Sequence, residues 1–298
     1  MRSRDTRGAK TPRHQTAPIL GAHESIGGGV STAIERAQKI EAQALQLFTK
    51  NSNQWKGKLL TSQEAEEFRE KRSKAGIQFA FAHDSYLINL ASPDKSLRAR
   101  SIAAFLDEMD RAELLDLDFI VFHPGAHMGD GIGQGCGRVA DAMSQVLEKR
   151  PKQNVRLLIE NAAGQGTTLG RTFEELAQIR EGVEDKARVG FCFDTCHAFA
   201  AGYELRTKEG YEATMKELNR TVGLDHVRAF HLNDSKKGVD CRVDRHQHIG
   251  KGEIGLEAFR MLLNDPRFSG RPMVLETPKS HDLHEDIENL STLRGLID

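Results

Sequence analysis

The chain has 298 residues, of which 38% are hydrophobic and 29% are charged, and its 42 basic and 43 acidic residues leave a net charge of -1. This balance excludes a surface that is basic throughout, so any phosphate-binding surface must be local. The four cysteines form neither a CxxC pair nor a dense disulfide pattern, which indicates a reducing compartment. The sequence contains no apolar run long enough to span a membrane, and we expect a cytoplasmic protein.

Residues 1–17 carry five Arg or Lys and one Asp, and they contain no apolar segment of the kind found in a secretory signal. This composition predicts a disordered basic tail, with weak affinity for a polyanion as the sharper alternative. A single domain is expected over residues 18–298.

From residue 18 onward, strand signals and helix signals alternate without a linker that would divide the chain. The predicted strands cover residues 18–23, 44–48, 78–84, 119–125, 156–161, 189–195, 227–234 and 272–277. The predicted helices cover residues 29–40, 62–75, 94–115, 138–149, 172–179, 208–222, 256–263 and 283–297. Eight such pairs predict a fold of the α/β class, a (β/α)₈ TIM barrel. A doubly wound open sheet is the alternative, but it needs fewer units, and no GxGxxG turn follows a strand here.

Polar side chains that can bind a metal follow one predicted strand after another. They are His23, His83, Asp84, His123, Glu160, Asn161, Asp194, His197, His231, Asn233, Asp234, Asp244, His246, His248 and Glu276. In a barrel, the carboxyl ends of the strands meet at one mouth, so these side chains are expected to converge. Each alone could be a helix cap or a satisfied loop residue, but together they would repel one another unless cations neutralise them.

The number of candidate ligands exceeds the four or five that one ion takes, which indicates two or three divalent ions. Zinc suits a mixture of imidazoles and carboxylates better than magnesium does, with manganese and iron as alternatives. Neighbouring metals that share a carboxylate favour a phosphodiesterase or phosphatase. A sugar isomerase or epimerase is the second hypothesis, because such barrels also hold one or two metals.

Seven segments carry a resemblance to a known family. They are HDSYLINLASP (83–93), FHPGAH (122–127), LIENAAGQG (158–166), FDTCHAFAAGY (193–203), HLNDSK (231–236), DRHQHIGKGEIG (244–255) and VLETP (274–278). In this order they resemble the endonuclease IV family of apurinic/apyrimidinic endonucleases, and the likeness runs over nearly the whole chain from residue 18.

The resemblance implies a barrel with three zinc ions that cleaves DNA on the 5′ side of an abasic site, leaving a 3′-hydroxyl and a 5′-deoxyribose phosphate. It implies three ligand sets: His83, His123 and Glu160; Glu160, Asp194, His231 and Glu276; and His197, Asp244 and His246. Glu160 and Glu276 would orient or deprotonate the attacking water, and manganese could replace part of the zinc. The expected partner is double-stranded DNA with abasic sites or blocked 3′ ends, with no membrane and no obligate protein partner, and the protein is expected to be a monomer.

The family also inserts side chains into the duplex where the abasic nucleotide is flipped out. Tyr86 and Leu87 match two inserting positions, but the third, an Arg in the family, is Asn53 here. Lys50, Lys56 or Trp55 could compensate for the missing Arg. Arg245 is a candidate phosphate contact, with a salt bridge to Asp244 or Asp240 as the alternative. A non-catalytic damage-binding protein is a third hypothesis, but a binder has no use for a water-activating metal cluster.

Overall fold

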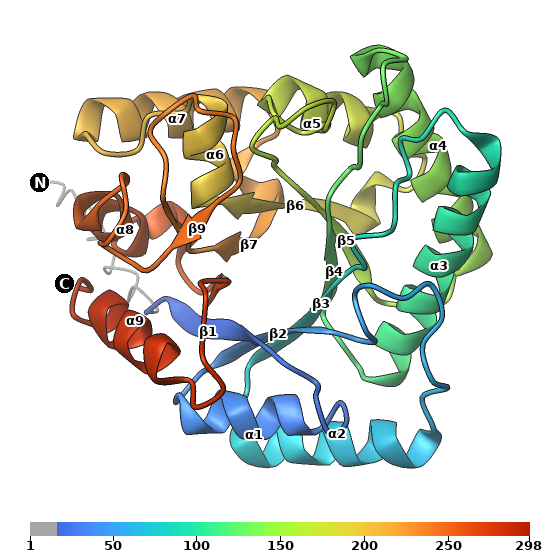
Figure 1. Ribbon diagram of the computed structural model, residues 1–298, viewed down its shortest axis with the longest axis horizontal. Coiled ribbons are helices and arrows are strands. Elements are labelled where there is room, and N and C mark those ends of the chain that lie inside the picture. Colours follow the sequence, from blue (N-terminus) through green and yellow to red (C-terminus); the bar gives the residue numbers. More distant parts are fainter. Residues whose placement is uncertain (1–16) are drawn as a thin grey trace, which may run out of the picture.

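The computed structural model describes residues 17–298, which form a closed barrel of parallel strands surrounded by helices (Figure 1). The strands follow the order β1-β10-β7-β6-β5-β4-β3-β2 around the barrel. The predicted TIM barrel is therefore confirmed, and the open sheet is excluded. The predicted disordered tail lies outside the described residues, apart from Ala17.

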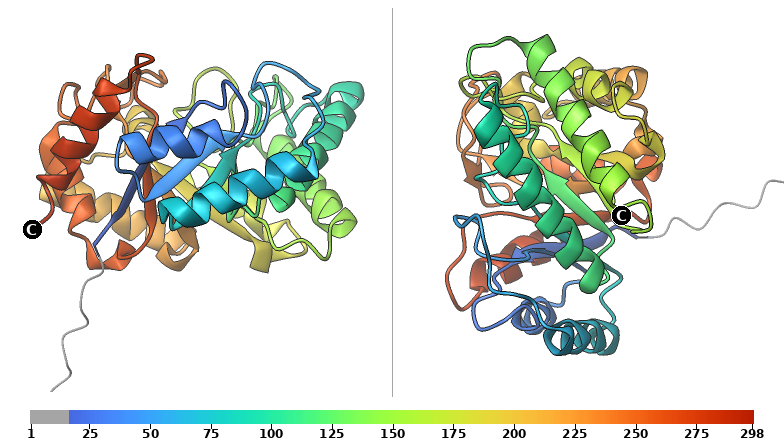
Figure 2. Two further views of the ribbon diagram at one scale, coloured as in Figure 1. Left: turned by 90° about the horizontal axis from the view of Figure 1, so that it is seen from below. Right: turned by 90° about the vertical axis from the view of Figure 1, so that its right-hand side faces the viewer.

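The barrel strands are short, and each begins within one residue of its predicted start. They are β1 (Ile19–Glu24), β2 (Ala44–Phe48), β3 (Phe79–His83), β4 (Phe119–Phe122), β5 (Arg156–Glu160), β6 (Val189–Asp194), β7 (Val227–His231) and β10 (Pro272–Leu275). The helices are α1 (Thr32–Lys39), α2 (Ser62–Ala75), α3 (Lys95–Leu114), α4 (Ile132–Lys149), α5 (Phe173–Glu181), α6 (Thr195–Ala201), α7 (Lys208–Thr221), α8 (Leu256–Leu263) and α9 (His284–Arg294). The side views show most of these helices lying along the outside of the strands (Figure 2).

The inside of the barrel is built in layers because alternate residues of a strand point to the same side. Near the amino ends of the strands, the interior is filled by an apolar cluster that includes Phe81, Leu158 and Val274. Two residues further along the chain come His83 and Glu160, the last residues of β3 and β5, and Glu276, which directly follows β10. The period of two therefore places an apolar floor directly beneath a polar mouth.

Local sequence signals explain where the outer helices begin and end. Thr61 caps α2, since its hydroxyl oxygen accepts a hydrogen bond from the Glu64 amide while the Glu64 carboxylate accepts one from the Thr61 amide. Gly76 ends the same helix in the left-handed conformation, at φ 69°. None of the helices in the described part of the chain combines the length and apolar character needed to cross a membrane.

Helices α4 and α6 and a short two-stranded hairpin differ from the prediction. Helix α4 begins at Ile132 rather than at residue 138, although its first turns contain three glycines. A Cβ at Gly135 would lie 2.8 Å from Leu169 and 2.9 Å from His127, so this glycine lets the helix approach both side chains. Helix α6 was missed because all of its residues are buried, which removes the amphipathic pattern. The short hairpin of β8 (Asp234–Ser235) and β9 (His246–Gln247) was also missed.

Gly21 provides a test of the barrel packing. An added Cβ at this position in β1 would lie 1.7 Å from the carbonyl oxygen of Ala44 in the neighbouring strand. Gly21→Ala is therefore expected to lower the free energy of unfolding by about 3 kcal/mol, measured by urea denaturation. As the matched control, Gly137→Ala in the exposed face of α4 meets nothing within 4 Å and should raise it by about 0.5–1 kcal/mol. A tolerated Gly21→Ala variant would contradict this packing of β1 against β2.

Candidate metal centre

The barrel mouth brings together the polar side chains that the sequence places at its strand ends. Four groups of candidate ligands lie there, and within each group the ligand atoms lie within 4.8 Å of one another. They are His83, His123 and Glu160; Glu160, Asp194, His231 and Glu276; Asp194, His197 and His246; and Cys196, Asp244 and His246. All nine residues predicted as metal ligands belong to these groups, which makes the mouth a candidate metal centre.

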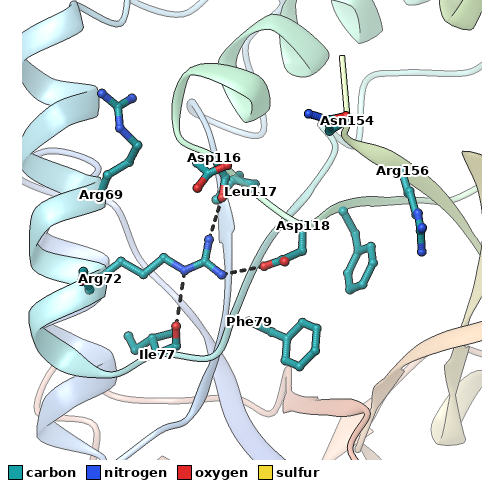
Figure 3. Close-up of a pocket in the computed structure, with 11 residues that line it drawn as sticks. Arg69, Arg72, Ile77, Phe79, Asp116, Leu117, Asp118, Asn154 and Arg156 are labelled. Atoms are coloured by element: carbon teal, nitrogen blue, oxygen red, sulfur yellow. Dashed lines mark hydrogen bonds and ion pairs between the residues drawn. The ribbon is translucent and has the colours of Figure 1, made fainter. Parts of the chain in front are cut away.

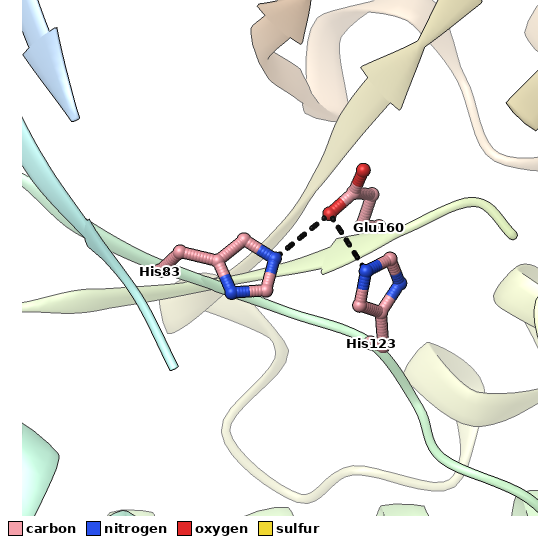
Figure 4. Close-up of side chains that lie close together, drawn as sticks. All are labelled: His83, His123 and Glu160. Carbon is pink, nitrogen blue, oxygen red and sulfur yellow. Dashed lines mark hydrogen bonds and ion pairs between the residues drawn. The ribbon is translucent and has the colours of Figure 1, made fainter. Parts of the chain in front are cut away.

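Glu160 lies at the middle of the cluster and is fully buried. Its Oε2 atom lies 3.2 Å from His83 Nε2 and 3.7 Å from His123 Nε2, and Figure 4 shows the two imidazoles directed at this one oxygen. Its Oε1 atom lies 2.9 Å from His231 Nδ1 and 3.1 Å from His197 Nδ1. The two carboxylate oxygens therefore face different histidines, which is the arrangement expected of a carboxylate shared between two ions.

The second group surrounds His231, which is also fully buried. Its Nδ1 atom lies 3.2 Å from Glu276 Oε2 and 3.8 Å from Asp194 Oδ2, in addition to its contact with Glu160. One imidazole nitrogen thus faces three carboxylates from β5, β6 and the end of β10. This set of donors matches the mixture of ligands that zinc takes in proteins.

The third group lies beside the second, towards the β8–β9 hairpin. His197 Nε2 and His246 Nε2 each lie 3.2 Å from an oxygen of Asp244, and the two ring nitrogens are 3.4 Å apart. The missed helix α6 carries His197, and the missed hairpin carries His246. The Cys196 thiol also lies close by, but burial raises its pKa to about 12, so it is a thiol rather than a thiolate at neutral pH.

Three of these imidazoles are oriented by a contact between one ring nitrogen and a backbone carbonyl. His83 Nδ1 donates to the Asp84 carbonyl at 2.9 Å, and His246 Nδ1 donates to the Glu276 carbonyl at 3.2 Å. His197 Nδ1 lies 3.0 Å from the Asn161 carbonyl. Metal-binding histidines are held in this way because the bond fixes both the tautomer and the ring orientation. In each of the three, Nε2 faces other ligands, and His197 Nδ1 also lies 3.1 Å from Glu160 Oε1.

Electrostatics agree with a site that needs cations. Burial alone would raise the pKa of Glu160, but the nearby His231 and His123 hold it well below its usual range. Burial also acts to lower the pKa of His83, yet Glu160 raises it to about 9. In the absence of ions, the protonated imidazole thus supplies part of the positive charge that the buried carboxylates require. These are residues that fit a bound divalent metal.

Two asparagines that follow strands β5 and β7 hold the candidate ligands Asp194 and Glu276 in place through hydrogen bonds. Asn161 accepts a hydrogen bond from the Asp194 amide at 2.8 Å and donates to the Asp194 carbonyl at 3.0 Å. Asn233 donates to Asp194 Oδ2 at 2.6 Å and accepts from the Glu276 amide at 2.8 Å. Asp234 acts on the backbone instead, because its carboxylate accepts hydrogen bonds from the amides of Gly250, Gly252 and Ile254 and shapes the loop after β9.

The residues predicted to contact DNA lie near the same mouth. Tyr86 is 64% exposed, and its ring packs edge-on against Phe48 at 5.3 Å. Together with His123, His197 and Asp244, it lines a cavity of about 590 Å³ that opens beside the candidate ligands. Leu87 follows it and is half-buried. Arg245 is exposed, and its guanidinium donates to the Asp244 carbonyl rather than to a carboxylate.

The structure of the loop after β2 limits which residue could compensate for the Arg that the family has at the position of Asn53. Lys50 is buried and paired with Asp107 and Glu108, 3.1 Å from the latter, so it cannot reach DNA. The suggestion that Lys50 compensates is therefore wrong, because α3 supplies carboxylates that the local sequence does not reveal. Trp55 packs under the Arg100 guanidinium of α3, 4.2 Å from the ring centroid. Asn53 itself is exposed.

A second cavity, of about 550 Å³, lies at the opposite end of the barrel, where β3, β4 and β5 begin (Figure 3). It contains arginines, but Arg72 donates to Asp118 Oδ2 at 2.7 Å and to the Asp116 carbonyl at 2.6 Å. Arg69 donates to the Leu114 carbonyl. These two guanidinium groups are used within the protein, whereas Arg156 is exposed. No group of candidate metal ligands in the described residues lies in this cavity, so the mouth is the stronger candidate for the functional site.

Comparisons with known proteins agree with the fold and with the site. Residues 34–294 match the family model described as a xylose isomerase-like TIM barrel. "Probable endonuclease 4" of Chloroflexus aurantiacus is 51% identical over 94% of this chain and 98% of its own length. "Probable endonuclease 4" of Geobacter sulfurreducens is 51% identical over 93% of this chain and 94% of its own. The crystal structure of endonuclease IV from Thermus thermophilus superposes with a TM-score of 0.83 at 36% identity, covering 94% of this chain and 98% of that one.

The fold and the site together define a xylose isomerase-like TIM barrel whose mouth gathers histidines and carboxylates. Within that class, the chain belongs to the endonuclease IV family. The resemblance seen in its sequence motifs is therefore confirmed.

Proposed function

We propose that the protein is a zinc-dependent apurinic/apyrimidinic endonuclease of base excision repair, which hydrolyses the phosphodiester on the 5′ side of an abasic site. The products would be a 3′-hydroxyl and a 5′-deoxyribose phosphate. Membership of the endonuclease IV family identifies a metal-dependent endodeoxyribonuclease. The observation that carries the finer proposal is the position of Glu160, whose two oxygens face separate pairs of histidines inside the barrel mouth.

The donor atoms suggest how ions would be held. His83, His123 and Glu160 would hold one zinc, and Glu160, Asp194, His231 and Glu276 a second. His197, Asp244 and His246, which contact one another, would hold a third. When bound, such ions lower the pKa of water and stabilise the charge that develops on the leaving oxygen. Manganese is the alternative at part of the site.

The side chains of the protein would orient the water and contact the DNA. Glu160 and Glu276 would orient the attacking water and accept its proton, because their carboxylates enclose the point where His231 Nδ1 faces the cluster. Tyr86 and Leu87 would enter the duplex beside the lesion, and the neighbouring cavity would receive the extrahelical sugar phosphate. Arg245, exposed on the hairpin loop, would contact a backbone phosphate. Blocked 3′ ends are a second proposed substrate, and a single chain would suffice for both.

The position and chemistry of the cut test this proposal. A duplex oligonucleotide with one tetrahydrofuran abasic analogue should be cut once, on the 5′ side of the analogue. The upstream fragment should be extended directly by a DNA polymerase, because it ends in a 3′-hydroxyl. A cut on the 3′ side, or an end that polymerase cannot extend, would contradict the proposal. Turnover of an aldose without cleavage of the duplex would instead support the isomerase hypothesis.

Tyr86→Ala provides a separate test of the proposed DNA contact. Since Tyr86 is 64% exposed at the mouth, truncation of its side chain should leave the fold intact. The dissociation constant for abasic duplex should rise about 10-fold through loss of the contact between the ring and the DNA. The measurement is fluorescence anisotropy with Glu160→Gln as background, so that the substrate stays whole. Tyr86→Phe is the control and should bind like the background protein, and equal binding by Tyr86→Ala would rule out the contact.

A further inference from the structure

His231 is oriented differently from the other histidines of the centre. His83, His197 and His246 each place one ring nitrogen against a backbone carbonyl. In His231, the ring nitrogen opposite the cluster, Nε2, instead lies 2.7 Å from the side-chain oxygen of Gln46. Gln46 is fully buried in the middle of β2, on the same side of the strand as the apolar residue Ala44.

The Gln46 side-chain amide contacts two candidate ligands of the same ion, one as a hydrogen-bond donor and the other as an acceptor. Its Nε2 atom donates to Glu276 Oε1 at 2.5 Å, while its Oε1 atom meets His231. The nitrogen must face Glu276, because an ionised carboxylate can only accept hydrogen bonds. The amide oxygen then faces His231 and can only accept, so the His231 proton must be on Nε2. The other nitrogen, Nδ1, faces Glu160, Glu276 and Asp194, and with the proton on Nε2 it is the nitrogen that would bind an ion.

The remaining hydrogen of the Gln46 amide is also used. His23 Nδ1 lies 2.8 Å from Gln46 Nε2, at a distance that suits an acceptor nitrogen. The Gln46 nitrogen can only donate, so His23 Nδ1 is the acceptor in this contact. His23, which the family resemblance leaves outside the metal set, thus holds Gln46 in place. Every hydrogen-bonding atom of the Gln46 side chain has a partner.

We propose that Gln46, supported by His23, is a positioning residue of the metal centre: it fixes the His231 tautomer and turns one oxygen of Glu276 away from the ion. This rests on the proposed function, since it presumes an ion held by Glu160, Asp194, His231 and Glu276. Loss of such an outer partner typically weakens metal binding about 10- to 100-fold. Gln46 does not touch the DNA or the reacting atoms in this account.

Two substitutions separate the contacts that Gln46 makes. Gln46→Met keeps an unbranched side chain of similar length but removes the contacts to His231, Glu276 and His23. Gln46→Glu keeps an acceptor for His231 and removes the donor to Glu276. The control is Leu45→Ala, at the neighbouring buried position of β2, whose side chain packs in the outer apolar core. It should lower the unfolding temperature without altering the metal centre.

The experiment measures zinc binding by competition with a chromophoric chelator and the imidazole N–H signals of ¹⁵N-histidine-labelled protein. We expect one zinc per chain to bind about 10- to 100-fold more weakly in Gln46→Met and Gln46→Glu, and to bind normally in Leu45→Ala. The Nε2–H signal of His231, identified by its absence in His231→Gln, should disappear in Gln46→Met and persist in Gln46→Glu. These results would support the proposal.

Other outcomes would overturn it. Wild-type zinc affinity in Gln46→Met would overturn the positioning role alone, and so would an equal loss of affinity in Leu45→Ala. A wild-type protein that binds no zinc would overturn the proposed function, and this inference with it.

Discussion

The Glu160→Gln variant is expected to bind a duplex with an abasic site at near wild-type affinity and to cleave it on the order of 10³-fold more slowly. Glu160 contacts His83, His123, His197 and His231, and it is the candidate ligand that the first and second groups share. An amide in its place carries no charge and offers only one acceptor oxygen, so it cannot face two ions. The measurements are the single-turnover cleavage rate and binding by anisotropy.

The matched control for this variant is Glu175→Gln. Glu175 is also a buried carboxylate, but it accepts hydrogen bonds from the amides of Gly170 and Arg171, which a glutamine oxygen can still accept. It should cleave at close to the wild-type rate. Undiminished cleavage by Glu160→Gln would remove the argument for a shared carboxylate.

The Asp244→Asn variant is expected to lose about one metal ion per chain while it retains the other two, and to cleave about 10²-fold more slowly. Asp244 links the two histidines of the third group, since one of its carboxylate oxygens contacts His197 and the other contacts His246. Burial alone would raise its pKa, but hydrogen bonds to these histidines hold the pKa far below its usual range, so the group is an anion at neutral pH. The measurement is the metal content by atomic emission together with the cleavage rate.

Asp240→Asn is the control, because Asp240 lies on the same loop but pairs with Arg171 at 3.2 Å and with Arg242 at 3.5 Å. Its positive φ of 57° is one that asparagine also adopts. The control should keep its full metal content and activity. If Asp244→Asn kept all of its metal, Asp244 would not be a ligand of the third site.

The sequence predicts most of the ligand cluster because the position of a residue in a barrel strand determines whether its side chain points into the barrel and at which end it lies. In β3, β5 and β6, an apolar residue that points into the barrel is followed two positions later by His83, Glu160 or Asp194. Parallel strands of a closed barrel bring all such positions to one end. Strand parity and the strand ends were therefore enough to find the mouth without knowledge of any contact.

Gln46 was not identified from the sequence because it does not stand at a strand end. It lies inside the predicted strand 44–48, among apolar neighbours, and only its parity with Ala44 indicates that it points into the barrel. A polar residue at an inward position of a buried strand is the signal that could have found it, because such a group needs hydrogen-bond partners. Those partners, Glu276 and His231, come from strands far away in the sequence.

The burial of Lys50 has the same physical origin. Beside Asn53 in the sequence, it looks like an exposed cation, but Asp107 and Glu108 of α3 pair with it and bury it. Pairings between residues this distant depend on the packing of helices against the barrel. They cannot be derived from the pattern of one loop.

The decisive measurement for a zinc-dependent abasic-site endonuclease is the metal content of the purified protein, combined with its cleavage of a tetrahydrofuran-containing duplex before and after prolonged chelation. We expect about three zinc ions per chain, a single cut that is lost with the ions, and recovery of the cut when zinc is restored. Full cleavage by protein from which the metal has been removed would contradict the proposed zinc dependence.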